Sequence, residues 1–140
     1  DGIWRDTRYN GNYVCNFLAG KEFKIKNNGI ISTLSTSLRA SMAGGVRYTP
    51  IDLEQSIIDG ETVRHDEMAF SEQRDPFMRF DFKVSYRKNK KKTTRVWELD
   101  IQNVSNRLNV AGDWYEDDKQ KIEEWTQLGL LPTISYRIEF

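Results

Sequence analysis

The sequence is 140 residues long, and no run in it approaches the ~18–20 consecutive apolar residues of a membrane-spanning helix. Its 21 basic and 21 acidic residues cancel, which leaves no net charge to attract nucleic acid. An aromatic content of 12% excludes intrinsic disorder, because disordered segments are poor in aromatic residues. The first residues, Asp1 to Trp4, include neither a methionine nor an apolar run, so no signal peptide is expected in this sequence.

Alternation of apolar and polar residues predicts two strands in the first third of the chain. The first strand covers about residues 13–25 and is the less regular of the two. The second covers residues 30–42; one face is mostly apolar, and the other is wholly polar from Thr33 onward. The segment between them ends in Asn28-Gly29, which is a signal of a tight hairpin turn.

Three further strands are expected in the second half of the chain. Residues 77–87 show a very strong alternation, and a short basic run joins them to a strand over residues 94–104. A last strand runs from Ile134 to Phe140. The two remaining connections, residues 43–76 and 105–132, are several times longer, and residues 117–127 can form a short helix.

The sequence therefore predicts an all-β fold of about five antiparallel strands that run alternately up and down. Both tight turns then lie at one end of the sheet and both long loops at the other. A strand of about 11 residues, at roughly 3.3 Å per residue and a tilt of about 40°, spans on the order of 28 Å, close to the apolar band of an outer-membrane barrel. Such alternation is also typical of a soluble sandwich or barrel with a packed core. Aromatic residues towards the strand ends favour the membrane barrel.

Several segments of the chain carry a resemblance to a known family. The last strand sets Ile134, Tyr136, Ile138 and Phe140 on one face, which resembles the C-terminal assembly signal of bacterial outer-membrane barrels. Further segments resemble the closing strands of TonB-dependent receptors of the Bacteroidetes type: Gly-Lys-Glu-Phe at 20–23, Arg-Tyr-Thr-Pro-Ile-Asp at 47–52, Ser-Tyr-Arg-Lys-Asn at 85–89, and residues 100–107 and 131–140. The resemblance runs from about Trp4 to Phe140.

The resemblance implies a fold, a location and an activity. Residues 1–140 would be a C-terminal fragment of a transmembrane β-barrel in the bacterial outer membrane, without the plug domain and the N-terminal barrel strands. The whole receptor would bind an extracellular ligand and import it with energy from TonB, and this fragment would supply barrel wall and two extracellular loops. The implied partners are outer-membrane lipid, the barrel-assembly machinery at the C-terminal strand, TonB through the missing N-terminal part, and an unknown small ligand. No cofactor and no enzymatic activity are expected.

On this interpretation the two faces of the sheet meet different surroundings. The lipid-facing residues are expected to be Leu34, Leu38, Met78, Phe80, Phe82, Val84, Tyr86, Trp97, Leu99 and Ile101. The lumen-facing residues are expected to be Arg39, Arg79, Asp81, Lys83, Arg87, Glu98, Asp100, Arg137 and Glu139, pairing with each other or with the plug. In the long loops, Arg47, Tyr48, Trp114 and Tyr115 are the candidates for ligand contact, although such aromatic side chains can equally pack the loops together.

The remaining motifs have plainer interpretations. The basic run between Arg87 and Arg95 could meet nucleic acid or an anionic membrane surface, but a solvated hairpin turn is favoured. The acidic stretch from Asp113 to Glu124 matches no calcium loop. His65 is the only histidine, and Cys15, the only cysteine, has no histidine near it in sequence, so neither predicts catalysis.

Two other classes of protein stay open at this point. One is a soluble, secreted all-β module that holds carbohydrate with its aromatic loops. In that module, Phe80, Phe82, Leu99 and Ile138 would form a closed core instead of a lipid-facing band. The other is a barrel of the same membrane type that acts as an adhesin or scaffold.

Overall fold

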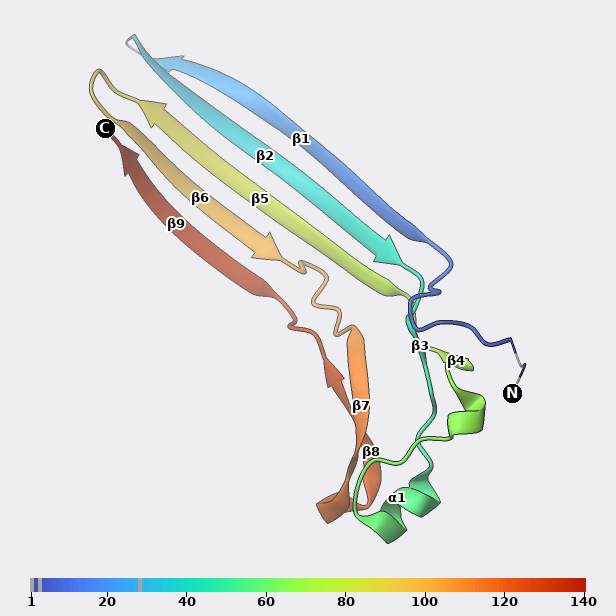
Figure 1. The fold of residues 1–140 in the computed structure, drawn as a ribbon. Helices are drawn as coiled ribbons and strands as arrows, with labels where there is room; N and C mark the ends of the chain where they lie inside the picture. Colours follow the sequence, from blue (N-terminus) through green and yellow to red (C-terminus); the bar gives the residue numbers. More distant parts are fainter. Residues whose placement is uncertain (1, 3, 28) are drawn as a thin grey trace. The chain divides into compact units, whose positions relative to one another are not determined.

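The computed structural model describes residues 2, 4–27 and 29–140. Asp1, Ile3 and Asn28, which belong to the N-terminal stretch and the hairpin turn considered above, lie outside the described residues. The described chain is mostly antiparallel β-structure and separates into two compact units (Figure 1). The sheet unit consists of Asn16–Ser41, Met78–Arg107 and Gly129–Phe140, and the loop unit of the chain up to Cys15, Met42–Phe77 and Leu108–Leu128.

The sheet unit is built on one five-stranded sheet, counted over the described residues, in the order β1-β2-β5-β6-β9. Its strands are β1 (Val14–Asn27), β2 (Ile30–Ala43), β5 (Phe77–Asn89), β6 (Thr94–Gln102) and β9 (Leu131–Glu139). Each strand runs against its neighbour, as the arrows in Figure 1 show. The expected all-β, antiparallel, up-and-down sheet is therefore confirmed, with the two tight turns at one end and the two long connections leaving from the other.

The register of the sheet follows from the period of the sequence. Tyr86 of β5 lies opposite Trp97 of β6, and Trp97 lies opposite Tyr136 of β9. Because successive side chains point to opposite faces, this register gathers the apolar residues of these three strands on one face and the charged ones on the other. The structure ends β6 at Gln102, two residues before the expected end, since Asn103 takes a φ of 52°.

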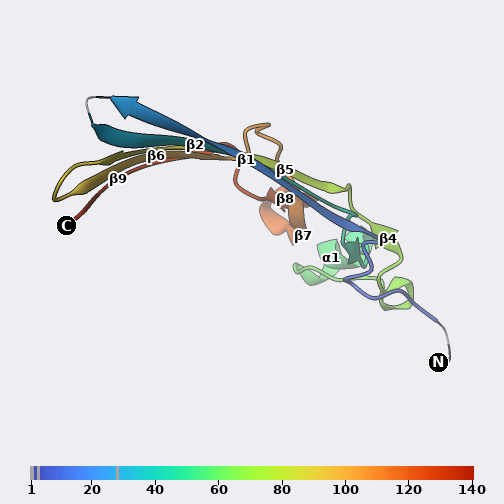
Figure 2. The same cartoon turned by 90° about the horizontal axis from the view of Figure 1, so that it is seen from above.

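The five strands form a single curved layer (Figure 2). Among the described residues of the sheet unit, no second layer covers either face. Val96 and Ser32 are its buried strand residues, each about 5% exposed, and the large apolar side chains of the sheet are intermediate or exposed. The unit therefore has no closed hydrophobic core of its own.

The loop unit contains the remaining elements. They are β3 (Arg47–Tyr48) paired with β4 (Glu72–Gln73), α1 (Leu53–Asp59), β7 (Val110–Glu116) paired with β8 (Lys121–Thr126), and 3-10 turns over Asp66–Met68 and Asp117–Lys119. Its interior holds Ile51, Tyr115 and the fully buried Ser56, whose hydroxyl accepts a hydrogen bond from the backbone N–H of Val63. In the described part of the chain, no helix has the length and apolar character to cross a membrane.

The structure of the long loops differs from the sequence analysis in two places. Residues 117–127, which could form a short helix, are instead the turn and second strand of the β7–β8 hairpin, in which Tyr115 lies opposite Ile122. The helix that does form, α1, was not expected. Asp52 caps its first turn by accepting a hydrogen bond from the N–H of Gln55, and Gly60 ends it with a φ of 71°.

Candidate functional site

The expected lipid-facing residues share one face of the sheet. Phe82, Val84 and Tyr86 lie opposite Ile101, Leu99 and Trp97, and Met78 and Phe80 follow the same phase along β5. Leu34 and Leu38 alternate with Ser37 and Arg39 of β2, which line the polar face with Arg79 and Asp100. On β9, Ile134 and Tyr136 continue this apolar face. All of these apolar side chains are intermediate or exposed.

The exposure of this apolar face is high for a sheet in water. Ile134 is 83% exposed, Tyr136 51%, and Phe82 and Leu99 36% each. An apolar side chain gains free energy when it leaves water, at roughly 25 cal/mol for each Å² that is covered. A continuous band of this kind marks an interaction surface, because soluble monomers rarely expose one.

Three aromatic rings form a ladder across this face near the end of the sheet that carries the tight turns. The ring centroids of Tyr86 and Trp97 are 5.7 Å apart, and those of Trp97 and Tyr136 are 5.3 Å apart, with tilted planes in both pairs. Each such pair stabilises the sheet by about 0.5–1.5 kcal/mol beyond the area that it buries. The ladder lies close to the strand ends, with Tyr86 three residues before the end of β5 and Trp97 three residues after the start of β6.

The opposite face carries the charges that were expected to line a lumen. Arg79 donates two hydrogen bonds to Asp81, at 2.7 and 2.9 Å, and Lys83 lies 2.8 Å from Glu98. Glu139 contacts both Arg87, at 3.2 Å, and Arg137, at 3.0 Å. Arg39 and Asp100 line a shallow depression of about 80 Å³ on the same face. All nine expected residues thus lie on one polar face, where ion pairs form within and between strands.

The loop unit contains a cavity of about 430 Å³ that brings two of the candidate ligand residues together. Arg47 and Tyr48 line it from β3, and Trp125 lines it from β8. Three further arginines complete the lining: Arg8, Arg64 and Arg74. With Asp113 as its carboxylate, the lining carries four guanidinium groups against one negative charge. Guanidinium groups beside aromatic rings are suited to an anionic or flat polar ligand.

Asp113 organises this cavity. Its carboxylate accepts hydrogen bonds or ion pairs from Arg64 at 2.7 Å and from Arg74 at 3.0 Å, and the side chains of Arg74 and Asp113 are each only 8% exposed. The guanidinium of Arg74 also stacks on Tyr48, 4.3 Å from the ring centroid. Nothing in the sequence pattern indicated Arg64, Arg74 or Asp113 as site residues, because they come from segments far apart in the chain.

The two other candidate ligand residues do not line this cavity. Trp114 is partly exposed, and its Nε1–H donates to Glu116 at 3.3 Å. Tyr115 is only 5% exposed, so it lies inside the loop unit and not on an exposed surface where a ligand could reach it. Burial and the neighbouring Asp117 carboxylate raise the pKa of the Tyr115 phenol.

The other motifs lie in plain surroundings. His65 Nδ1 is 3.4 Å from carboxylate oxygens of both Asp52 and Glu67, and Cys15 is exposed. Over the described residues, no group of three or more His, Cys, Asp or Glu side chains could hold a metal ion. In the acidic stretch, Glu123 pairs with Lys119 at 2.9 Å, which makes this part of the loop an ion-paired hairpin turn.

Comparison with known proteins gives no further assignment: no family model, no curated protein and no solved structure matches this chain.

Proposed function

We propose that this chain is the C-terminal barrel segment of a TonB-dependent outer-membrane receptor of the Bacteroidetes type. The sheet unit is barrel wall, with its apolar face towards lipid and its polar face towards the lumen. The two long connections are extracellular loops that contact the imported ligand. The complete receptor binds that ligand and imports it with energy from TonB, and the segment by itself transports nothing.

The observation that carries this proposal is the exposed apolar face described above. Phe82 and Leu99 lie opposite partners on the same face, and no described element of the sheet unit covers them. In water such a face costs free energy, while in a bilayer it meets hydrocarbon. The proposal therefore accounts for a regular, well-paired sheet that lacks a core.

The polar face gives independent support. Its charges are arranged in pairs, such as Lys83 with Glu98, yet these side chains are 43% and 30% exposed. Side chains of this kind suit the water-filled interior of a barrel, where lumen-facing residues alternate with lipid-facing ones. The sheet also ends in β1 on one side and β9 on the other. A barrel closes by pairing such edges with further strands, which in this proposal belong to the rest of the receptor.

A second candidate is the soluble carbohydrate-binding module, which the cavity of the loop unit favours. Tyr48 and Trp125 line that cavity beside arginines, and aromatic rings next to hydrogen-bond donors are typical of small-molecule sites. In this second candidate another molecule or segment would have to cover the apolar face of the sheet. The two candidates therefore differ in what Phe82 contacts.

Spin labelling separates the two candidates. With Cys15 replaced by serine, a nitroxide is attached in turn to F82C and K83C in a bilayer or detergent, and its collisions with oxygen and with a water-soluble nickel chelate are measured. The receptor predicts a label at position 82 that is reached by oxygen and shielded from the chelate, and the reverse at position 83. Shielding of position 82 from both reagents, in a chain that is monomeric without detergent, would overturn the receptor proposal in favour of the soluble module.

A further inference from the structure

The apolar face of the sheet ends in two cations that lie opposite each other. Lys88 follows Tyr86 by two residues on β5, and Arg95 precedes Trp97 by two residues on β6. The register places Lys88 opposite Arg95. Because the side chains alternate, both belong to the face of the aromatic ladder. Like charges directly opposite each other destabilise a sheet, so this arrangement lacks a structural advantage.

No carboxylate in the hairpin balances these two cations. The segment from Arg87 to Trp97 contains no acidic residue. The nearest carboxylate of β9, Glu139, pairs with Arg87 and Arg137 on the polar face. Among the described residues, the Nε of Arg95 is buried and has no hydrogen-bond partner. Because this Nε is shielded from the surface, an acceptor from outside the chain would bind the terminal nitrogens of the same guanidinium.

The position of the pair specifies the kind of acceptor. Two strand residues at about 3.3 Å each place Lys88 and Arg95 roughly 7 Å beyond the aromatic ladder along the sheet. Aromatic girdles lie at the boundary between hydrocarbon and headgroups, so the next layer outward is the headgroup layer. The turn that follows adds Lys90, Lys91 and Lys92, all exposed. Phosphate oxygens are the acceptors that guanidinium and ammonium groups share most readily.

We propose that Lys88 and Arg95 form a binding site for the phosphate of an anionic phospholipid at the turn end of the sheet. Arg95 supplies paired N–H donors to the phosphate oxygens, and Lys88 supplies a second positive charge that favours an anionic lipid over a zwitterionic one. The ladder of Tyr86, Trp97 and Tyr136 packs against the glycerol and upper acyl chains of the same lipid. This inference rests on the proposed function, since it requires the apolar face to meet a bilayer.

The test measures lipid selectivity beside the ladder. Trp4, Trp114 and Trp125 are replaced by phenylalanine so that Trp97 is the only tryptophan, which is excited selectively over tyrosine, and the chain is reconstituted into bilayers. Quenching of Trp97 by phosphatidylglycerol and by phosphatidylcholine, each brominated on its acyl chains, gives their relative binding beside the ring. We expect a preference of roughly fivefold or more for phosphatidylglycerol, because each basic residue near an anionic surface adds a favourable contribution. In the double variant K88Q/R95Q the two lipids should bind beside Trp97 about equally, because only the general attraction between the charged surfaces remains and it is screened by salt.

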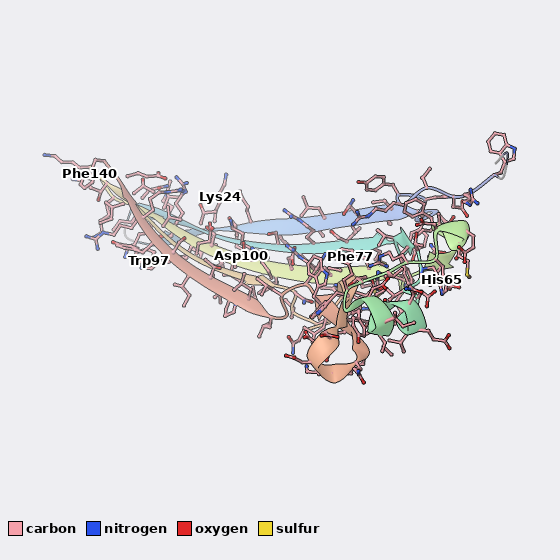
Figure 3. All side chains as sticks on the ribbon, turned by 60° about the horizontal axis from the view of Figure 1, so that its bottom comes forward. Lys24, His65, Phe77, Trp97, Asp100 and Phe140 are labelled. Carbon is pink, nitrogen blue, oxygen red and sulfur yellow. The ribbon has the colours of Figure 1, made fainter. Side chains whose placement is uncertain are left out.

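A matched control removes two cations from the other face. Lys24 and Lys26 lie at the same end of the sheet, and Figure 3 shows Lys24 and Trp97 on opposite sides of it. The variant K24Q/K26Q should keep the preference for phosphatidylglycerol. An equal loss in both double variants would overturn the proposed site, because it would reflect general charge attraction.

The outcomes also separate this inference from the function on which it depends. If neither brominated lipid quenches Trp97, the lipid-facing assignment fails and the headgroup site fails with it. If both lipids quench Trp97 equally, the receptor proposal stands and only the headgroup site is overturned. Loss of the preference on addition of millimolar inorganic phosphate at constant ionic strength would show a site for free anions and would also overturn the lipid assignment.

Discussion

The carboxylate of Asp81 holds the backbone of Asn103. Asp81 Oδ1 accepts a hydrogen bond from the Asn103 N–H at 3.0 Å, and the next residue, Val104, donates its N–H to the carbonyl oxygen of Phe80 at 2.7 Å. Arg79, two residues earlier on the same strand β5, donates two hydrogen bonds to this carboxylate and holds it in place. The chain is thus tied to β5 by a side chain at Asn103, directly after β6 ends at Gln102.

The first prediction concerns this strand end. D81A leaves the N–H of Asn103, a residue only 3% exposed, without its acceptor, which costs about 1–3 kcal/mol of folding stability. Hydrogen exchange over residues 102–107 should become faster while exchange in the centre of β6 changes little. The control is D100A. It removes a carboxylate from the same polar face, but this carboxylate does not hold the backbone at a strand end. Equal exchange in the two variants would contradict the proposed tie.

The second prediction concerns the aromatic ladder. W97A removes both ring pairs at once and should lower the free energy of unfolding by about 1–3 kcal/mol beyond the loss of apolar contact. W97F keeps an aromatic ring and should retain part of the stabilisation that the ring pairs provide. Urea unfolding in detergent, followed by near-ultraviolet circular dichroism, measures both variants. I134A serves as the control because Ile134 shares the face and is 83% exposed. A loss for W97A no larger than that for I134A would show that the ladder adds nothing.

The alternating strands could be predicted because their signal is local. A strand shows its two faces within a few residues, so Phe82 and Lys83 can be assigned to opposite faces from the sequence alone. The register that sets Tyr86 opposite Trp97 follows in turn from a short connection that leaves little choice of pairing. The lipid and lumen assignments remain predictions, since sidedness does not identify the solvent on each side.

The loop unit was harder to predict because its contacts are distant in sequence. Asp113 meets Arg64 from 49 residues away, and no spacing rule links two such positions. The helix α1, in contrast, did carry a signal: Asp52 followed three residues later by Gln55 is a capping pattern, and Gly60 is a typical stop. Residues 117–127, which could form a short helix on sequence grounds, instead form the turn and second strand of a hairpin.

The third prediction tests the centre of the loop cavity. D113A removes the closest carboxylate from Arg74, whose side chain is only 8% exposed. Breaking a buried ion pair in this way lowers the free energy of unfolding by about 3–5 kcal/mol. R74M should cost less, because it removes the charge and retains most of the packing on Tyr48. The double variant D113A/R74M should therefore be more stable than the sum of the two losses predicts. Additive losses in urea unfolding would contradict the coupling.

The fourth prediction concerns a close backbone approach in the loop unit. A Cβ added at Gly44 would lie 1.5 Å from the carbonyl oxygen of Gly11, so G44A must separate the two segments. The hydrogen bond from the Gly44 N–H to the Tyr13 carbonyl oxygen, 2.9 Å long, should then be lost. We expect a destabilisation of about 1–3 kcal/mol and faster hydrogen exchange at residues 11–14. The reference is S41A, a change three residues earlier in the chain. Similar hydrogen exchange at residues 11–14 in G44A and S41A would count against the close approach of Gly44 to Gly11.

The last prediction concerns pH and the turn of the β7–β8 hairpin. Hydrogen bonds from Lys119 and Lys121 lower the pKa of Glu123 below its usual range. Because the folded pKa is depressed, the stability that this carboxylate contributes is present above the ordinary glutamate pKa of about 4.3 and is lost as the pH falls through the folded value. A nuclear magnetic resonance titration of the Glu123 side-chain carboxyl carbon should show this depressed midpoint, and K119A/K121A should return it to the ordinary range. Added salt should move it in the same direction, since these side chains are solvated and their attraction is screened. A midpoint unaffected by the double substitution would mean that the two lysines do not hold the carboxylate in solution.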